Sequence, residues 1–303
     1  MSQHSPSPHF LVGIDGGGSS TRAHLTDAVG RWLGQGRAGP SSLRLGPQAA
    51  WQAVETARVA AFRAAGIEPA AVAQCAIGLG LAGVGVPAQT AAFLQAAPPF
   101  ARLVLDSDAI AAVLGAHGGA AGVVVASGTG SVGAALGRDG SRRLIGGWGF
   151  PVGDEGSGAW LGLRAMQHTH HVADGQYADG ALARAVRAVA GTDRQTLLDW
   201  CAGADAQRYA ALAPLVFDAA AEDPAAEALL ARAAQALQAL ALALDLRAEL
   251  PLALMGSIGE RLAPRFGQAT RSRLTAPLGD AAEGAWRLVA PGLQRTRIRP
   301  PAG

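Results

Sequence analysis

The chain has 303 residues, half of them hydrophobic, so it can bury an ample core and is expected to form two domains. The net charge is only +2 and the arginines are scattered, so no basic field is available to hold nucleic acid. All 25 basic residues are arginine, and the absence of lysine excludes a Walker-type phosphate loop, whose GxxxxGK[ST] motif needs one.

The sequence predicts a cytoplasmic protein with no membrane partner. Residues 1–8 lack the charged and apolar regions of a signal peptide. The longest apolar stretch, around residues 236–246, is too short and too interrupted to span a bilayer. Cys75 and Cys201 lie far apart without metal-ligand spacing, so both are expected to be inert buried thiols, as in a reducing cytosol.

The first part of the chain alternates strands and helices. An apolar strand over residues 10–14 is followed by strands over residues 23–27 and 31–35, which complete a meander. Residues 47–65 predict a helix that Gly66 stops. A strand over residues 73–81 comes next, then a helix, another strand and another helix.

The strand over residues 102–105 leads directly into the helix that ends near Gly115. Strands near residues 122–126, 133–136 and 142–146 then repeat the opening meander. This repetition predicts two related α/β domains.

Helices dominate the next segment. The longest spans residues 227–249, where apolar residues three to four positions apart predict a stripe that faces the core. A strand over residues 252–255 follows, and a last helix, about 283–295, is expected to return to the first domain. The predicted domains are therefore residues 9–108 with that helix, and residues 109–282.

A glycine-rich turn follows a short apolar strand at two places. The first turn runs from Asp15 to Ser19 and the second from Ser127 to Ser131. Glycines let the backbone bend tightly, and exposed N–H groups form a concavity that binds anions. The first turn continues into a strand rather than a helix, so it is not a Rossmann loop. Two such turns predict two half-sites that grip one polyphosphate, and hence a nucleotide-dependent phosphotransferase.

Carboxylates stand at the ends of two predicted strands. Asp15 can hold the waters of a Mg²⁺ ion beside the phosphates, although an aspartate there is also a common turn former. Transfer of phosphate to an alcohol needs a carboxylate that accepts the hydroxyl proton. Asp106 or Ser107 can cap the following helix, and Asp108 is the predicted base.

Residues 146–158 are too rich in glycine for an ordinary connector. Carboxylates accept hydrogen bonds from sugar hydroxyls, so Asp154 in this segment is a candidate sugar ligand. Glu155 can equally be an acid that the positive end of a helix dipole favours.

A group of histidines follows this segment on a predicted helix. On that helix only His168 and His171 share a face, and His170 points elsewhere. No acidic or cysteine ligand lies at a supporting spacing, so no metal site is expected there.

With these motifs, the chain resembles the N-acetylglucosamine kinase branch of the sugar kinase, Hsp70 and actin superfamily, which shares a domain with BadF/BadG-type ATPases. The resemblance covers nearly the whole chain and rests on Asp15–Ser19, Ser107–Ala109, Ser127–Ser131, residues 146–149, residues 153–157 and Gly256–Ser257. It implies an α/β fold of two ribonuclease-H-like domains, the duplication seen in actin-like ATPases. These domains would close over ATP and sugar in an interdomain cleft.

The resemblance also implies a role for each motif. Asp108 would be the catalytic base and a sugar contact, and Mg²⁺ would lie near Asp15, held through water. The residues facing the phosphates of ATP would be Gly16, Gly17, Gly18, Ser19, Gly128, Thr129 and Gly130. The adenosine loop would be Gly256 and Ser257, and the other sugar contacts would be Ser42, Gly147, Trp148 and Asp154.

The chain departs from the family at two positions. The family commonly places an asparagine on the sugar in the segment that matches residues 39–43, and this chain, which has no asparagine, must use Ser42 or Ser41. A serine that some relatives use after the strand over residues 73–81 is Ala82 here. Each change alters a hydrogen bond near the amino sugar, so N-acetylglucosamine, glucosamine and related sugars stay open.

The predicted activity is ATP- and Mg²⁺-dependent phosphorylation of an amino sugar, N-acetylglucosamine at the 6-hydroxyl, with glucosamine as an alternative. A BadF-type ATPase that activates a dehydratase is the second alternative. It needs cysteine thiolates around an iron–sulfur cluster, and Cys75 and Cys201 lack a glycine-rich cluster loop. A sugar-sensing regulator would need a DNA-binding module, for which the segment before the first strand is too short. The pathway and the oligomeric state, a homodimer included, stay open.

Overall fold

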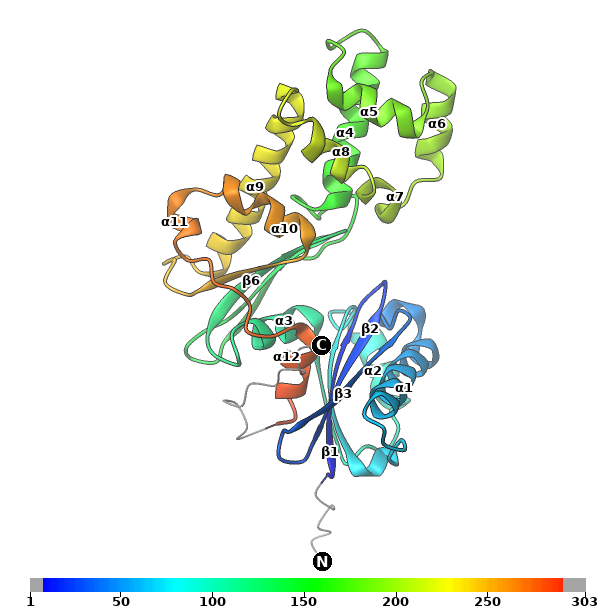
Figure 1. Cartoon of the computed structure of the whole chain (residues 1–303), viewed down its shortest axis with the longest axis vertical. Coiled ribbons are helices and arrows are strands. Elements are labelled where there is room, and N and C mark those ends of the chain that lie inside the picture. The colour runs from blue at the N-terminus through cyan, green and yellow to red at the C-terminus, as the bar shows by residue number, and fades with distance from the viewer. Residues whose placement is uncertain (1–7, 291–303) are drawn as a thin grey trace, which may run out of the picture. The chain divides into compact units, whose positions relative to one another are not determined.

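A computed structural model of the chain describes residues 8–290, which divide into two compact units (Figure 1). Within the described residues, unit 1 holds residues 8–122, 135–142 and 276–290, and unit 2 holds residues 123–134 and 143–275. Residues 1–7, which belong to the segment where no signal peptide is predicted, and the part of the predicted last helix after residue 290 lie outside the described residues.

The strands of unit 1 form a sheet in the order β3-β2-β1-β4-β5. They are β1 Phe10–Gly16, β2 Thr21–Asp27, β3 Trp32–Ala38, β4 Cys75–Leu81 and β5 Arg102–Ser107. The first three strands form the predicted antiparallel meander, whereas β1, β4 and β5 run parallel. The carboxyl ends of the parallel strands therefore lie at one edge of the sheet.

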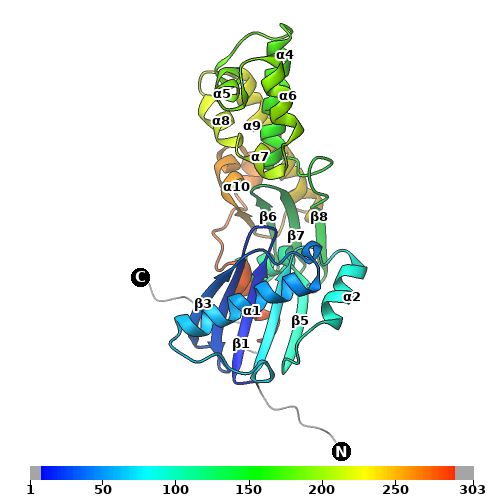
Figure 2. The ribbon, with the colours of Figure 1, turned by 90° about the vertical axis from the view of Figure 1, so that its right-hand side faces the viewer.

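One face of this sheet carries the larger apolar core. Helix α1, Pro47–Ala64, lies across it, as Figure 2 shows, and α2, Pro87–Gln95, packs beside α1. Fully buried side chains such as Ile14, Ile77 and Phe62 fill the space between the sheet and the helices. Helix α1 matches the predicted helix closely, whereas the position of α2 was not located from the sequence.

The other face of the sheet is packed through glycines. Helices α3, Asp108–Ala116, and α12, Ala281–Arg287, lie against it and against each other. A Cβ atom on Gly13 of β1 would collide with the carbonyl oxygen of Ala282, and one on Gly78 of β4 with that of Ala285. The helix can approach the strands this closely only because these positions have no side chain.

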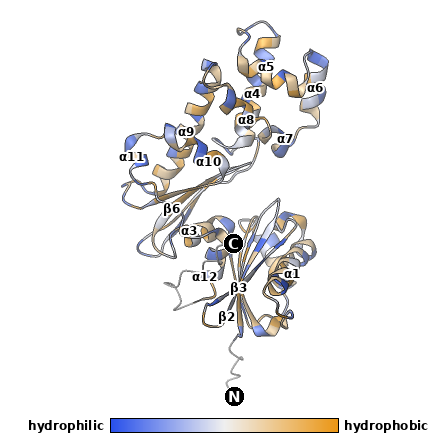
Figure 3. Cartoon of the chain, in the orientation of Figure 1, coloured by the Kyte–Doolittle hydropathy of each residue, from blue (hydrophilic) through white to orange (hydrophobic). Residues whose placement is uncertain are grey.

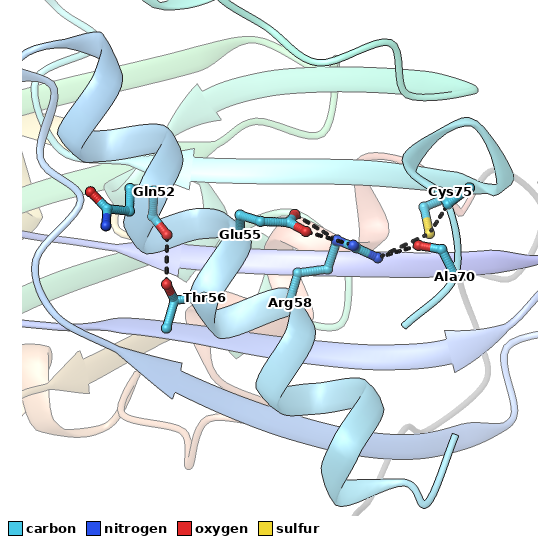
Figure 4. A network of polar contacts seen from close by, with 7 residues as sticks. Gln52, Glu55, Thr56, Arg58, Ala70 and Cys75 are labelled. Carbon is cyan, nitrogen blue, oxygen red and sulfur yellow. Dashed lines mark hydrogen bonds and ion pairs between the residues drawn. The ribbon is translucent and has the colours of Figure 1, made fainter. Parts of the chain in front are cut away.

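An arginine takes a core position on α1 that the apolar pattern did not predict. Arg58 is buried, and its guanidinium pairs with both carboxylate oxygens of Glu55 at 2.7 Å (Figure 4). It also donates to the carbonyl oxygen of Ala70 and contacts the sulfur of Cys75. The prediction that Cys75 is buried is confirmed, and this burial raises the pKa of its thiol.

The sheet of unit 2 has the order β8-β7-β6-β9, which repeats the order β3-β2-β1-β4 of unit 1. Its strands are β6 Gly122–Ser127, β7 Ser131–Leu136, β8 Arg142–Gly146 and β9 Leu252–Met255. As β1 pairs with β4, so β6 pairs in parallel with β9. The duplicated topology confirms the predicted α/β fold of two related domains.

Helices cover the rest of unit 2. They are α4 Gly158–Ala173, α5 Ala181–Ala190, α6 Arg194–Ala202, α7 Ala206–Ala210, α8 Ala213–Ala219, α9 Pro224–Leu244, α10 Ser257–Leu262 and α11 Gln268–Arg271. Helix α9 begins earlier than predicted because Asp223 caps it, with the side chain accepting from the amide of Ala225.

By length and composition alone, α9 is the one helix of the described residues that could cross a membrane. The longest apolar stretch was predicted at residues 236–246, whereas the apolar helix in fact spans Pro224–Leu244. Buried residues such as Leu230, Ala233 and Leu237 repeat along α9 three to four positions apart, and Figure 3 colours the helix with both polar and apolar segments. This pattern is typical of a helix that packs one side against its own unit.

The boundary between the units differs from the prediction. We expected the first domain to end at residue 108, but α3 belongs to unit 1, which continues to Gly122. The reason is close packing: a Cβ atom on Gly284 of α12 would collide with the carbonyl of Ala111, and one on Gly115 of α3 with that of Asp280. Residues 135–142, which run from the end of β7 to the first residue of β8, are also grouped with unit 1.

We expect Gly13→Val to lower the free energy of unfolding by about 2–3 kcal/mol, because the valine side chain would force α12 away from β1. Urea unfolding of the full chain measures this. Gly85→Val is the matched control, since a Cβ atom there meets open space and the stability should stay within about 0.5 kcal/mol. Equal stabilities of the two variants would contradict the close packing of α12.

Candidate active site

The carboxyl ends of three parallel strands gather the predicted residues of unit 1. Asp15 of β1, Gly80 of β4 and Asp106 of β5 are in register across the sheet. Asp108 starts α3 directly after β5. Ligands of open α/β sheets bind outside this edge, so the sheet places both predicted carboxylates where a ligand is expected.

The first glycine-rich turn closes the hairpin between β1 and β2. The amide of Gly17 donates to the carbonyl oxygen of Ser20 at 3.1 Å, while Gly18 and Ser19 are exposed. A Cβ atom on Gly16 would collide with the hydroxyl of Ser41. The turn therefore presents its tip to solvent while its base is packed against the segment that follows β3.

That segment distinguishes the two serines that could replace the asparagine of the family. Ser41 is fully buried and accepts a hydrogen bond of 2.8 Å from the hydroxyl of Thr21. The hydroxyl of Ser42 donates to the carbonyl of Ala82 over 3.5 Å, a distance at which a hydrogen bond is weak. The hydroxyl of Ser42 therefore has the weaker hydrogen bond within the protein and is more readily available to a ligand than that of Ser41.

Asp15 forms an ion pair that the sequence analysis did not consider. Arg22 on β2 donates to Oδ2 of Asp15 from Nη2 at 2.7 Å and from Nε at 3.2 Å. Burial raises the pKa of Asp15 in spite of the charge of Arg22. Behind Arg22, Asp280 is half-buried. Its partial burial raises its pKa, but its hydrogen bond with His24 and the charges of His24 and Arg22 outweigh this effect and lower the pKa to about 2.

Asp106 and Asp108 have different partners. Asp106 accepts from the amide of Ser107 at 2.8 Å and forms an ion pair with Arg142. Of the two candidate caps, Asp106 and Ser107, the structure assigns Ser107 as the N-cap of α3, since its hydroxyl accepts from the amide of Ile110. Asp108 accepts from the amide of Ala109 at 2.8 Å, and burial, followed by the nearby charge of Asp15, raises its pKa. A carboxylate with a raised pKa is suited to accept a proton near neutral pH.

In unit 2 the second glycine-rich turn rests on the start of α4. The amide of Gly158 donates to the carbonyl of Gly128 at 2.8 Å, and that of Ala159 to the carbonyl of Thr129 at 3.1 Å. Thr129 itself is exposed. A Cβ atom on Gly256 would collide with the carbonyl of Ser127, so the predicted adenosine loop lies directly beside this turn. Its neighbour Ser257 is exposed at the start of α10.

The glycine-dense segment is bound to the same turn. Oδ1 of Asp154 accepts from the amide of Ser131 at 3.2 Å, and a Cβ atom on Gly130 would lie 2.9 Å from Oδ2. Asp154 has a φ of 63°, which is uncommon for a residue other than glycine and often marks a functional site. The amide of Gly147 donates to the carbonyl of Ser131, and the side chain of Trp148 is 83% exposed. Unit 2 thus brings its predicted phosphate and sugar residues together.

Glu155 does not lie in the first turn of α4. The N-cap of that helix is Ser157, two positions later, and its hydroxyl accepts from the amide of Trp160. Glu155 instead offers its carbonyl oxygen to the hydroxyl of Ser131 at 2.8 Å. Its side chain therefore starts no helix, contrary to the alternative considered for it.

The histidines of α4 have separate partners. The rings of His168 and His171 both contact Tyr177, which confirms that they share a face. His170 lies 3.7 Å from the sulfur of Cys201, which is half-buried rather than buried as predicted.

A magnesium ion fits unit 1 only if the protein supplies few of its ligands. In the part of the chain that the structure describes, no three His, Cys, Asp or Glu side chains are grouped to hold a metal ion. Asp15 stands alone at the first turn, with Oδ2 engaged by Arg22. Mg²⁺ keeps several waters and binds phosphates through one or two carboxylates, so this donor set suits an ion that arrives with a nucleotide.

The sequence held a signal for Arg22 that the analysis missed. The turn of the hairpin lies between Gly16 and Thr21, which are paired, so the next residues outward, Asp15 and Arg22, must face each other. The pairing of Arg142 with Asp106 had no such local signal, because the two residues are far apart in the sequence.

Comparison with known proteins identifies one family of ATPases and two related kinases that are named for amino sugars. The model of the BadF/BadG/BcrA/BcrD ATPase family matches residues 12–266. Glucosamine kinase GspK of Vibrio cholerae is 34% identical over 278 residues, which are 91% of this chain and 94% of that protein. The N-acetylmuramic acid/N-acetylglucosamine kinase of Clostridium acetobutylicum is 27% identical over 162 residues, or 52% of each chain.

Solved structures agree in fold. A protein of Chromobacterium violaceum, provisionally named an N-acetylglucosamine kinase, has 47% sequence identity and a TM-score of 0.89, with 94% of this chain and 100% of that chain covered. A ROK family glucokinase of Streptomyces griseus, solved with glucose and AMPPNP, has 18% identity and a TM-score of 0.55, with 93% of this chain and 100% of that chain covered. The second likeness shows the fold alone.

We expect Gly128→Val to weaken ADP binding by about tenfold or more, because a side chain there would occupy the position that the sequence predicts for a phosphate. A Cβ atom on Gly128 meets no protein atom within 4 Å, so the fold should be unaffected. Calorimetric titration with ADP measures the affinity. Gly130→Val is a less clean test, since its side chain would displace Asp154. Unchanged affinity in the folded Gly128→Val variant would remove this turn from the nucleotide site.

Proposed function

The chain belongs to the BadF/BadG/BcrA/BcrD ATPase family, and we propose that it transfers the γ-phosphate of ATP to the 6-hydroxyl of an amino sugar. The observation that carries this proposal is the carboxylate of Asp108. It is half-buried at the edge of the sheet where Asp15 also stands, it accepts from the helix amide beside it, and it has no ion-pair partner among the described residues. Such a group can accept a proton from an alcohol.

In this mechanism the sugar oxygen attacks the γ-phosphorus as its proton passes to Asp108. The bond between the γ-phosphorus and the bridging oxygen breaks, and ADP leaves. Magnesium, bound through water near Asp15, would neutralise part of the charge on the phosphates. The enzyme's task is mainly to position both substrates and to exclude water from the phosphate.

We assign the nucleotide to the two glycine-rich turns. The first turn, from Gly16 to Ser19, whose tip at Gly18 and Ser19 is exposed, and the second turn, from Gly128 to Gly130, would each offer backbone amides to the phosphates. Gly256 and Ser257 would hold the adenosine, since they adjoin the second turn within unit 2.

We assign the sugar to Asp108, Ser42, Gly147, Trp148 and Asp154. Ser42 supports this assignment because its hydroxyl has the weaker hydrogen bond within the protein, and Trp148 because its large apolar ring is exposed. An exposed tryptophan provides a flat surface for the apolar face of a sugar ring.

Glucosamine is the first substrate to test. The sequence favoured N-acetylglucosamine, and the 47% identical protein of Chromobacterium violaceum is provisionally named a kinase of that sugar. The Vibrio cholerae relative, which is matched over 94% of its length, is instead named a glucosamine kinase, so the named relatives divide between the two sugars. ADP production measured with glucosamine, N-acetylglucosamine, glucose and N-acetylmuramic acid would decide. Turnover with glucose alone, or with no sugar, would overturn the amino-sugar proposal.

An ATPase that activates a dehydratase is less well supported by the cysteines. A cluster shared between protomers needs thiolates at the surface. Cys75 is fully buried under Arg58, and Cys201 lies on α6 beside His170.

Asp108→Asn should lower kcat by roughly 10²–10⁴, because the amide keeps the size of the side chain but cannot accept a proton. In the parent, kcat/KM should fall as the pH drops through the raised pKa of Asp108, above the usual range of an aspartate. Steady-state kinetics over pH measures both effects. Asp106→Asn, which removes the ion pair with Arg142, is the control; a larger loss there would identify Asp106 as the base.

Asp154→Ala should raise the KM for the sugar by about 10-fold or more and change the KM for ATP less, because sugar hydroxyls would lose a charged acceptor worth about 1–3 kcal/mol. Glu155→Ala should have little effect, since the contact of Glu155 with the turn is made by its backbone. Comparable changes in both KM values would instead indicate that Asp154 only supports the second turn.

A further inference from the structure

We propose that Arg22 is a positioning residue for phosphoryl transfer: it holds one oxygen of Asp15 so that the other faces the magnesium of the nucleotide. The inference rests on the proposed function and adds to it a residue outside both glycine-rich turns. Asp15 alone would be a flexible ligand at the end of a strand, whereas the pair is a fixed one.

Two N–H groups of Arg22 converge on a single oxygen of Asp15. Nη2 lies 2.7 Å and Nε 3.2 Å from Oδ2, and no hydrogen bond to Oδ1 occurs within residues 8–290. The planar guanidinium therefore restrains the rotation of the carboxylate and leaves Oδ1 as an acceptor. A lysine could supply the charge but not this two-point contact.

The register of the hairpin fixes the pair. Asp15 and Arg22 are direct partners on β1 and β2, one step outside the pair Gly16 and Thr21 that closes the first turn. The backbone that presents the exposed amides of Gly18 and Ser19 thus also sets the separation of the two side chains. A ligand bound at the turn would therefore lie close to Asp15, because only the pair Gly16 and Thr21 separates Asp15 from the turn.

Arg22 is supported from behind. Its Nη1 lies 3.6 Å from Oδ2 of Asp280, which also pairs with His24 at 3.4 Å. Asp280 is itself fixed, because its side chain caps α12 by accepting from the amide of Glu283. The guanidinium is therefore held between two carboxylates and keeps its orientation toward Asp15.

A purely structural role does not account for this arrangement. The side chain of Arg22 is 42% exposed, and ion pairs at such positions contribute little to stability. The charge matters more for the site: Asp15 and Asp108 are both acidic, and a polyphosphate must bind beside them. Arg22 offsets the negative charge of Asp15 by binding Oδ2, and it leaves Oδ1 without this contact.

The test compares Arg22→Gln with Arg22→Lys in the full chain. Calorimetric titration with ADP, with and without Mg²⁺, and steady-state kinetics are the readouts. We expect Arg22→Gln to weaken ADP binding about 10–100-fold in the presence of Mg²⁺ and less than about 2-fold in its absence. The value of kcat should fall by a similar factor with the KM for the sugar nearly unchanged, and Arg22→Lys should recover part of both losses.

Arg31→Gln is the matched control. Arg31 lies in the turn between β2 and β3 and pairs with Asp27 at 3.1 Å, so its loss removes an ion pair at the end of β2 that is remote from the first glycine-rich turn. It should bind ADP and turn over like the parent. An equal loss in Arg31→Gln, or a lower melting temperature of Arg22→Gln without a change in Mg²⁺-dependent binding, would show a merely structural role.

The Asp15→Asn variant, alone and combined with Arg22→Gln, gives a double-mutant cycle for this pair. If Arg22 acts through Asp15, adding Arg22→Gln to Asp15→Asn should change Mg²⁺-dependent ADP binding by less than about 2-fold. Additive effects, or an equal loss of ADP affinity without Mg²⁺, would mean that Arg22 contacts the phosphates itself and would overturn the proposal. These titrations need no sugar, so they decide on Arg22 even if no amino sugar is phosphorylated.

Discussion

The parallel pairing of β1 with β4, and of β4 with β5, is the constraint on which the site of unit 1 depends. It brings Asp15 and Asp106 into register and ends the strands at one edge, so that Asp108 follows directly at the start of α3. A change of one residue in this register would turn Asp15 to the opposite face, toward the core under α1. The site is therefore set by backbone hydrogen bonds before any side chain makes a contact.

The face that carries these carboxylates also has glycines where α12 and α3 contact it, beside a small apolar cluster that includes Leu11 and Trp286. Gly13, Gly78 and Gly80 let α12 and α3 approach the strands until backbone atoms touch. That approach brings the cap of α12, Asp280, next to Arg22 and His24 of β2. Packing and electrostatics are thus coupled, because small residues let the helices place charged groups beside the first turn.

The two units share a topology but fix their glycine-rich turns by different means. In unit 1, a carboxylate and a guanidinium face each other at the base of the turn. The residue of unit 2 that corresponds to Asp15 is Ser127, which is buried and donates to the carbonyl of Gly156. Unit 2 instead takes its carboxylate, Asp154, from the separate segment after β8. The two units therefore share a strand order, but the carboxylate beside the glycine-rich turn comes from a different place in each unit.

The sequence by itself determined the strands, the repeated meander, both glycine-rich turns and the choice of candidate carboxylates. These features depend on local periodicity and on residues that are close in the chain. Hairpin register would also have revealed the pair of Asp15 and Arg22, since it follows from the length of the turn. Only the tertiary structure decided that Arg58 is a core residue, that α3 belongs to unit 1 and that Arg142 engages Asp106. Each of these depends on contacts between segments far apart in the sequence, whose distances no local pattern encodes.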